Sequence, residues 1–373
     1  MKVVFLTCYF NHHQRHLSDA LAERCDYAFI ATTPYNPKRL AMGWKPEEEP
    51  AYVCHYDTDP ARANALLEQA DVVITGSAPE EPVGQCIRRG QLVLRYCERP
   101  LKNGLEPLKF LPRYIKWHLR NPAKGNIHML CASAYTAGDY WKFRLFRGKT
   151  YRWGYFPQVH RYENVLGRKK KNTILWAGRF IGLKHPERAL EVARRLKEAG
   201  FDFQMKVVGS GELEEQLRQQ ARDLEDRVEF TGSMSPEQVR REMEQAEIFL
   251  FTSDRHEGWG AVLNEAMNSG CAVVADAAIG SAPFLIQDGE NGLLYPTEDV
   301  DTLYNKVVSL LESEELRQRL GRKAYETMIN DWNPDAAAQR LLTLISNLLA
   351  GEGTPFEQGP CSPAAHLRED WYQ

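Results

Sequence analysis

The chain has 373 residues, which exceeds one ordinary domain and favours two. Its residues are 43% hydrophobic and 26% charged, values that are typical of a globular protein and exclude a disordered or fibrous chain. The net charge of −3 conceals an asymmetry, because residues 100–171 carry sixteen Lys and Arg against three acids, a local charge of +13 that leaves −16 for the rest. Such a basic block indicates a polyanionic partner or an anionic membrane surface.

The composition also bears on the cellular compartment. No apolar run reaches the roughly 18 residues of a membrane span. The short apolar N-terminus is followed by polar, His-rich sequence instead of a small-residue cleavage site, so we expect no signal peptide. The eight cysteines include no CxxC pair, which favours reduced thiols over a disulfide framework or a zinc site. We therefore expect a cytoplasmic protein that can lie peripherally on the inner face of the plasma membrane.

In the first half of the chain, short apolar runs alternate with amphipathic stretches, which predicts a parallel sheet covered by helices. The expected strands are Val3–Leu6, Tyr27–Ala31, Val72–Thr75, Leu92–Tyr96 and Ile127–Cys131.

Two patterns in this half could suggest a metal site. The string Asp57-Thr-Asp59 has the form of a metal-binding DxD, but Asp59 precedes Pro60 and a helical pattern, which favours a helix N-cap. His12, His13 and His16 lack a carboxylate or Cys at zinc-ligand spacing, so they indicate an active-site loop, with plain surface histidines as the alternative. We expect no metal at either place.

Residues 110–124 (FLPRYIKWHLRNPAK) mix aromatic rings with five basic residues, four Lys and Arg and one His. This composition is typical of an interfacial segment, with rings at the level of the lipid headgroups and cations on anionic lipid. The alternatives are an ordinary amphipathic helix packed on its domain and, far behind, a nucleic-acid-binding patch.

Residues 167–172 (GRKKKN) interrupt the alternation and are the expected linker. A second strand series follows: Thr173–Ala177, Phe203–Val208, Val228–Thr231, Ile248–Phe251 and Ala272–Ala275. The expected helices between these strands are Pro186–Ala199, Leu213–Leu224, Pro236–Gln245 and Ala261–Asn268. A final helix is expected at Pro334–Ala350 with Asn333 as its N-cap, before a turn-rich tail that Phe356, Trp371 and Tyr372 could dock.

The strongest local motif begins at Glu257 and reads EGWGAVLNE, so that Glu265 follows eight residues later. Two glycines before a helical run let backbone N–H groups face a ligand, and the helix dipole favours a diphosphate. On a helix the two carboxylates would lie about 12 Å apart along the axis and on roughly one side. That spacing suits hydrogen bonds to the sugar and ribose hydroxyls of a nucleotide-sugar. The alternative, which two glutamates by themselves favour, is a solvated Glu at the start of the helix and an exposed Glu on it.

Three further loops place glycine directly after an expected strand. Gly178 precedes Arg179 and, five residues later, Lys184, two cations that can converge on phosphate oxygens. The second loop reads VGSG over residues 208–211, and the third reads FTGSM over residues 230–234. Each loop is a weak signal by itself.

Together and in this order, these motifs resemble the C-terminal domain of the family-4 retaining glycosyltransferases of the GT-B fold. The resemblance covers roughly Thr173–Ile345 and includes GRF…K, VVGSGE, FTGSM, the E-x7-E block and DGENGLLYPTED. It implies that Glu257 contacts the donor sugar, that Glu265 holds the ribose, and that Arg179 and Lys184 bind the diphosphate. The resemblance thus makes Arg179, Lys184 and Glu257 the expected catalytic residues.

The same resemblance extends the expected donor site and places an acceptor site in the first domain. The other expected donor-site residues are Gly178, Gly209, Gly211, Thr231, Gly232, Met234, His256, Gly258, Trp259, Gly260, Ala261, Val262 and Glu265. Relatives often have a Gly-Gly loop after the first strand and a His at the end of a later strand, whereas this chain has neither. The expected residues of the N-terminal cleft are Asn11, His12, His13 and Glu98.

The sequence therefore predicts an α/β protein of GT-B fold, with two Rossmann-like domains facing a central cleft. The expected boundaries are 1–166 for the acceptor domain, 172–333 for the nucleotide-sugar domain, and 334–373 for a helix and tail that return to the first domain. We expect a retaining, metal-independent transferase of a UDP- or GDP-sugar to a saccharide or lipid-linked saccharide, with no cofactor. The alternatives are a nucleotide-sugar epimerase of the same fold and a non-catalytic nucleotide-sugar-binding subunit.

Overall fold

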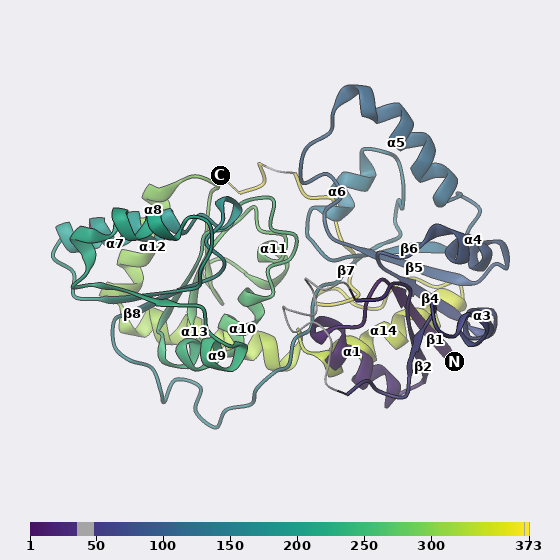
Figure 1. Ribbon diagram of the computed structural model, residues 1–373, viewed down its shortest axis with the longest axis horizontal. Helices are drawn as coiled ribbons and strands as arrows, with labels where there is room; N and C mark the ends of the chain where they lie inside the picture. Colours follow the sequence, from purple (N-terminus) through teal and green to yellow (C-terminus); the bar gives the residue numbers. More distant parts are fainter. Residues whose placement is uncertain (36–47, 369, 373) are drawn as a thin grey trace. The chain divides into compact units, whose positions relative to one another are not determined.

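The computed structural model describes residues 1–35, 48–368 and 370–372 (Figure 1). The chain divides into two compact units, one made of Met1–Gln158 with Asn333–Arg368 and the other of Val159–Trp332 with Glu369–Gln373. Each unit is built on its own parallel sheet. In the described part of the chain, no helix has both the length and the apolar character needed to cross a bilayer.

The first unit contains a seven-stranded sheet of order β3-β2-β1-β4-β5-β6-β7, in which every pair of neighbours is parallel. Its strands are β1 (Lys2–Thr7), β2 (Asp26–Ala31), β3 (Val53–His55), β4 (Val72–Thr75), β5 (Leu92–Cys97), β6 (Ile127–Cys131) and β7 (Thr150–Arg152). Its helices are α1 (His12–Ala22), α3 (Pro60–Gln69), α4 (Glu80–Arg88), α5 (Pro107–Arg120), α6 (Thr136–Trp141) and α14 (Pro334–Leu349). The side chain of Asp59 accepts a hydrogen bond from the amide of Arg62, so this Asp is the expected cap of α3.

The C-terminal segment returns to this unit. Helix α14 begins after Asn333, whose side chain accepts from the amide of Ala336, and it packs against α1 (Figure 1). The following tail is tied to β7, because the amide of Arg152 donates to the carbonyl of Ser362 at 2.8 Å. The last residues cluster with the second unit, where the Tyr372 hydroxyl donates to Asp288 at 2.7 Å.

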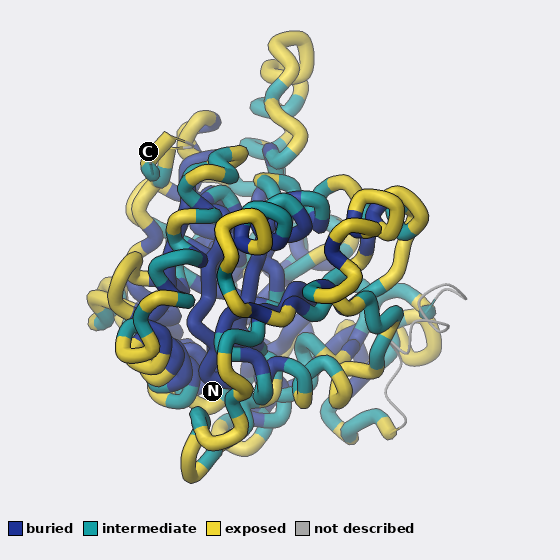
Figure 2. The backbone as a smooth tube through the Cα atoms, turned by 90° about the vertical axis from the view of Figure 1, so that its left-hand side faces the viewer, coloured by how far each residue is buried: buried dark blue, intermediate teal, exposed yellow. Residues whose placement is uncertain are grey.

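The second unit contains a six-stranded parallel sheet of order β10-β9-β8-β11-β12-β13. Its strands are β8 (Thr173–Ala177), β9 (Gln204–Val208), β10 (Val228–Gly232), β11 (Ile248–Phe251), β12 (Ala272–Asp276) and β13 (Leu293–Tyr295). Figure 2 shows buried strands inside more exposed helices, as expected for parallel strands covered on both faces.

The helices of the second unit largely follow the expected pattern, with one break. They are α7 (Pro186–Glu198), α8 (Glu214–Gln220), α9 (Pro236–Gln245), α10 (Val262–Asn268), α11 (Ala282–Leu285), α12 (Val300–Glu312) and α13 (Glu314–Asn330). Two short 3-10 helices lie at Gly182–Lys184 and Arg222–Leu224. The helix expected over Leu213–Leu224 is therefore wrong in its length, since it divides into α8 and a 3-10 turn.

The strand order of the second unit positions its candidate site. The chain runs outward from β8 through β9 to β10, and then returns to the other side of β8 with β11. Ligands of doubly wound sheets bind at the carboxyl ends of the strands where this direction reverses. The loops after β8, β9 and β11 carry the motifs singled out in the sequence.

Candidate donor-binding site

The glycine loops after β8 and β9 lie against each other and need residues without a side chain. Gly209 has φ +142°, and a Cβ atom at this position would lie 1.9 Å from the carbonyl oxygen of Gly178. The amide of Gly178 donates to the carbonyl of Val208 at 3.0 Å, and the amide of Gly209 donates to the carbonyl of Gly232 at 2.9 Å. The three loops therefore form one continuous edge at which backbone can approach a ligand closely.

These loops line a pocket of about 360 Å³, a volume in the range of small-molecule sites. The lining residues come from the ends of β8, β9 and β10, from the 3-10 turn before α7, and from α9 and the start of α10. They are Ala177, Gly178, Arg179, Lys184, Val208, Gly209, Ser210, Ser233, Met234, Val239 and Val262. The pocket thus brings together six of the expected residues: Gly178, Arg179, Lys184, Gly209, Met234 and Val262.

Two cations and one carboxylate define the electrostatics of this pocket. The ammonium of Lys184 forms an ion pair with the carboxylate of Glu257, and the two side chains are only 15% and 14% exposed. The Lys184 ammonium also lies 5.7 Å from the ring centroid of Phe251, which limits its access to water. Arg179 is exposed at the pocket, and the described residues offer its guanidinium no ion pair. The Lys184 ammonium is therefore held by a carboxylate, while the Arg179 guanidinium is available to an anion.

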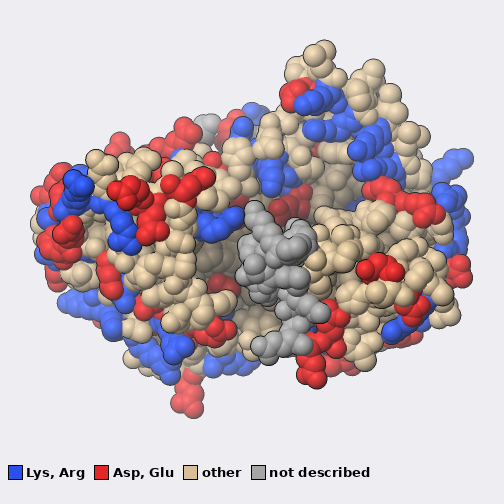
Figure 3. All heavy atoms as spheres, viewed as in Figure 1, with Lys and Arg blue, Asp and Glu red and all other residues tan. Residues whose placement is uncertain are grey.

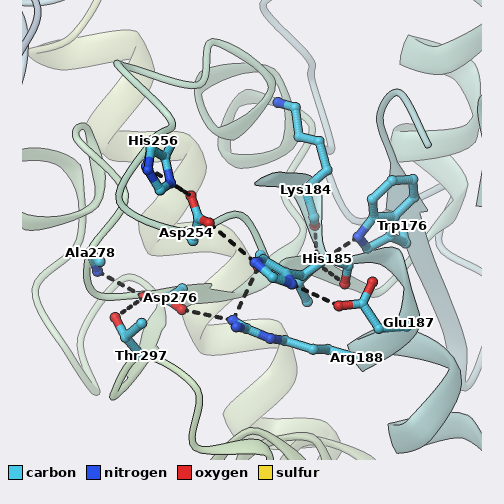
Figure 4. Close-up of polar contacts among 11 residues, drawn as sticks. Trp176, Lys184, His185, Glu187, Arg188, Asp254, His256, Asp276, Ala278 and Thr297 are labelled. Atoms are coloured by element: carbon cyan, nitrogen blue, oxygen red, sulfur yellow. Dashed lines mark hydrogen bonds and ion pairs between the residues drawn. The ribbon is translucent and has the colours of Figure 1, made fainter. Parts of the chain in front are cut away.

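A hydrogen-bonded network fixes the backbone that carries Lys184 (Figure 4). The indole of Trp176 donates to the hydroxyl of Thr252 at 2.8 Å. That hydroxyl lies 2.8 and 2.9 Å from the carbonyl oxygens of Lys184 and His185. His185 adopts a left-handed conformation with φ +47°, a cost that such bonds offset. The chain after β11 therefore positions the turn that holds Lys184.

His185 and Asp254 extend this network (Figure 4). The ring of His185 contacts Glu187 at 2.7 Å and Asp254 at 3.2 Å, and the bond with Glu187 raises the pKa of the imidazole. Burial opposes the charge on Asp254, but hydrogen bonds from the amide and ring of His256 hold its pKa below the usual value. His256 is thus tied to the loop by Asp254.

A buried ion pair lies beside this network. Asp276 is fully buried and contacts the guanidinium of Arg188 at 3.2 Å, while it also accepts bonds from Thr297 at 2.7 Å and the amide of Ala278 at 2.9 Å (Figure 4). Burial raises the pKa of Asp276 to about 6 in spite of these partners. The pair links α7 to the end of β12.

The EGWG block differs from its expected geometry. Helix α10 begins only at Val262, so Glu257 precedes the helix and the spacing of about 12 Å along a common helix axis is wrong. Gly260, with φ +82°, lies in left-handed backbone, and a Cβ atom there would be 2.5 Å from the ring of Phe251. Burial raises the pKa of Glu265 on α10. The two glutamates therefore occupy separate environments, one paired with a cation and one largely desolvated.

A second polar cluster lies in the first unit. The hydroxyl of Tyr155 donates to the carboxylate of Glu98 at 2.5 Å, and its ring stacks on that of His13 with centroids 5.3 Å apart. The rings of His12 and His13 lie 3.9 Å apart, and Asn11 caps α1 by accepting from the amide of His13 at 2.9 Å. Burial lowers the pKa of His13 to about 3, so this imidazole is neutral near pH 7.

The comparison with known proteins decides the family of the second unit. The family described as "Glycosyl transferases group 1" matches residues 160–327. Residues 160–327 are a group 1 glycosyltransferase domain.

The names of the relatives of this domain indicate different substrates. The chain is similar to a phosphatidyl-myo-inositol mannosyltransferase of Mycolicibacterium smegmatis, with 30% identity over 167 residues, 44% of this chain and 43% of that protein. It is also similar to the putative colanic acid biosynthesis glycosyltransferase WcaL of Escherichia coli, with 31% identity over 184 residues, 47% of this chain and 45% of that protein. The matched region thus spans less than half the length of these curated relatives.

Solved structures extend the fold likeness to almost the whole chain. A structure of Anabaena Alr3699/HepE in complex with UDP superimposes with a TM-score of 0.69 at 17% identity, covering 93% of this chain and all of that one. The lipopolysaccharide outer core galactosyltransferase WaaB, in its apo form, gives a TM-score of 0.67 at 15% identity, covering 94% of this chain and 99% of that one. The GT-B fold expected from the sequence, with a group 1 domain as its second half, is confirmed.

Several expected donor residues do not line the pocket of the group 1 domain. They are Gly211, Thr231, Gly232, His256, Glu257, Gly258, Trp259, Gly260, Ala261 and Glu265; Glu257 is tied to the pocket only through its ion pair with Lys184. Trp259 has a structural side chain, because its indole is fully buried and donates to Asn264 at 2.9 Å. Gly211 allows the loop after β9 to pack closely on the backbone of Phe180, since a Cβ atom there would lie 2.5 Å from the carbonyl oxygen of Phe180.

Both clusters include residues that no sequence pattern singles out. Ser210 and Ser233 line the donor pocket, with hydroxyl oxygens 2.6 Å apart. Tyr155 links Glu98 to His13 in the first unit. Only the fold shows the partners of Tyr155 and Asp254.

Proposed function

We propose that the protein is a retaining glycosyltransferase that moves a sugar from a UDP- or GDP-sugar to a saccharide or lipid-linked saccharide in cell-surface glycan synthesis. The pocket of the group 1 domain supports this proposal most strongly, since it combines glycine loops, the exposed Arg179 and the Lys184–Glu257 pair. The UDP in the HepE complex and the surface-polysaccharide names of the relatives support the substrate class.

In the proposed reaction, positive charge stabilises the departing diphosphate. The bond between the anomeric carbon and the diphosphate oxygen breaks while Arg179 and Lys184 face the phosphate oxygens, so that preformed charges act where negative charge develops. The acceptor oxygen bonds to the anomeric carbon on the same face, and its proton passes to an oxygen of the leaving diphosphate. These side chains supply the charge that a divalent metal supplies elsewhere, so the proposal needs no metal and no cofactor.

Glu257 has two roles in this proposal. Its carboxylate holds the Lys184 ammonium at the pocket, and it accepts hydrogen bonds from hydroxyl groups of the donor sugar. Glu265 is assigned to the ribose by its place in the E-x7-E block, and burial raises the pKa of its carboxyl. In the first unit, Glu98, Asn11 and the His12–His13 pair orient the acceptor, and Tyr155 positions Glu98.

The proposal is tested by product analysis of the full chain. UDP- and GDP-sugars are incubated with saccharide and lipid-linked acceptors, with and without EDTA, and the anomeric configuration of the product is read by NMR. We expect a product with the configuration of the donor, formed equally in EDTA. An inverted product or a metal requirement would overturn the respective part of the proposal, and conversion of the donor without any acceptor would favour the epimerase.

Replacing Glu257 tests its assignment. A hydrogen bond to a charged group contributes about 1.5–3 kcal/mol, so we expect Glu257→Ala to lower kcat/KM about 10- to 100-fold. The matched control is Glu312→Ala, which removes an exposed carboxylate at the end of α12 and leaves activity unchanged. Equal activity of Glu257→Ala and wild type would refute the role given to Glu257.

A further inference from the structure

Helix α5 is attached to the first unit by an aromatic side and, at its C-terminal end, by Arg120, whose guanidinium lies 3.6 Å from the carboxylate of Glu80. The ring of Phe110 stacks on Phe143 with centroids 5.0 Å apart, and the centroid of the Trp117 ring lies 4.6 Å from that of the same Phe143 ring. The ring of His118 lies 2.9 Å from the carbonyl oxygen of Phe143. The rings of Phe110 and Trp117 therefore anchor the helix to its own unit, and the interfacial character expected from the sequence stays a prediction for the other side of the helix.

The opposite side of α5 presents a row of aliphatic side chains. Leu108, Leu111, Ile115 and Leu119 are 92%, 63%, 51% and 78% exposed. Their spacings of three, four and four residues place them on one stripe of the helix, and α5 has no buried residue among its fourteen. Contiguous exposed apolar rows of this kind mark interaction sites in soluble proteins.

Cations run beside this row. Lys109, Arg113, Lys116 and Arg120 lie on α5, and Figure 3 shows Lys and Arg side chains gathered over this helix. Over residues 100–149 the sequence has ten Lys and Arg against two acids. This side of α5 therefore offers aliphatic side chains next to cations that attract negative charge.

A basic cavity lies at the C-terminal end of the same helix. It has a volume of about 200 Å³, and its lining includes His118 from α5 together with Arg144, Arg147 and Lys149. No acidic residue lines it. Arg144 has φ +57°, in a left-handed turn that directs the chain around the cavity. The cavity is suited in size and charge to a phosphate group.

We propose that α5 and this cavity form a docking surface for an anionic lipid bilayer. The four aliphatic side chains enter the acyl boundary, the cations of α5 lie among the headgroup phosphates, and the cavity receives the phosphate of one anionic lipid. Charge favours a bilayer over a second copy of the chain, since two such basic surfaces would repel each other. The inward-facing rings disfavour nucleic acid, because base stacking needs aromatic faces that are free.

The surface belongs to the first unit and the donor pocket to the second, so the test does not depend on transfer activity. The full chain is floated with vesicles of phosphatidylglycerol and phosphatidylcholine in equal amounts, and with vesicles of phosphatidylcholine alone. We expect binding to the anionic vesicles only, weakened when the salt rises from about 0.1 M to about 0.5 M. Equal binding to both compositions would overturn the charge argument.

Two variants separate the aliphatic row from the basic cavity. Leu111→Ser with Ile115→Ser is expected to lower partitioning at least about tenfold, because two aliphatic groups no longer enter the bilayer. Arg144→Gln with Arg147→Gln is expected to lower it about 30-fold, at about 1 kcal/mol for each cation near the surface. Arg322→Gln, an exposed cation on α13, is the matched control and binds like wild type.

The melting temperature of each variant confirms that it folds. Wild-type binding by both double variants would overturn the proposal. A different pattern would also overturn it: wild type that sediments as a dimer and binds no vesicles, and a Leu111→Ser, Ile115→Ser variant that sediments as a monomer. The aliphatic row would then join two copies of the chain.

Discussion

Replacement of Lys184 by Ala is expected to lower kcat of sugar transfer about 10²- to 10³-fold, the loss typical of removing one preformed group that faces developing charge. The Lys184 side chain is only 15% exposed, its ammonium is held by Glu257, and its backbone is fixed through Thr252. A charge so placed needs little rearrangement when the diphosphate leaves. Transfer kinetics at saturating donor measure the effect.

A surface lysine supplies the control for this experiment. Lys323 lies on α13 and pairs with Glu326 with 59% of its side chain exposed, so Lys323→Ala removes the same charge from an exposed position. We expect its kcat to equal that of wild type, and Lys184→Arg to recover part of the activity by restoring the charge. A kcat for Lys184→Ala that matches wild type would contradict the assignment of Lys184.

Replacement of Gly209 by Ala is expected to destabilise the second unit by about 3 kcal/mol or more, because backbone strain and overpacking each cost about 1–3 kcal/mol. The new methyl group would lie 1.9 Å from the carbonyl oxygen of Gly178, and this neighbour is backbone that cannot rotate away. For a unit of this size the melting temperature would fall by about 6–12 °C. Thermal unfolding followed by circular dichroism measures the fall.

Gly200 separates the clash from the cost of the backbone conformation. It has φ +78° after α7, but a Cβ atom there would meet nothing within 4 Å. Gly200→Ala should therefore cost only about 1 kcal/mol, the penalty of left-handed backbone. Similar melting temperatures for the two variants would show that the close approach of the loops after β8 and β9 does not matter.

The central strands were predictable from the sequence, whereas three of the four edge strands were not. Strand β11, flanked on both sides, is a continuous buried run and was placed at its exact ends, Ile248–Phe251. The missed strands β3, β7 and β13 have three residues each and lie at sheet edges. So short a run shows no periodicity, and its strand character comes from pairing with one neighbour.

Parts of the candidate site that depend on local sequence were predictable, and parts that depend on contacts between distant residues were not. The glycine loops were found because each follows its strand directly, whereas the contact of Lys184 with Glu257 joins residues 73 positions apart. The helical spacing assumed for Glu257 and Glu265 failed because Gly260 holds left-handed backbone before α10 begins. The roles of these residues in donor binding stay predictions.

The most direct test of nucleotide-sugar binding by the group 1 domain is a thermal-shift panel of UDP, GDP, ADP and their sugars. A ligand at a hundred times its Kd stabilises the folded protein by about 2.7 kcal/mol. We therefore expect UDP or GDP, with its sugars, to raise the melting temperature by about 5–11 °C in wild type, and much less in Arg179→Ala with Lys184→Ala. No shift with any of these nucleotides would contradict the account.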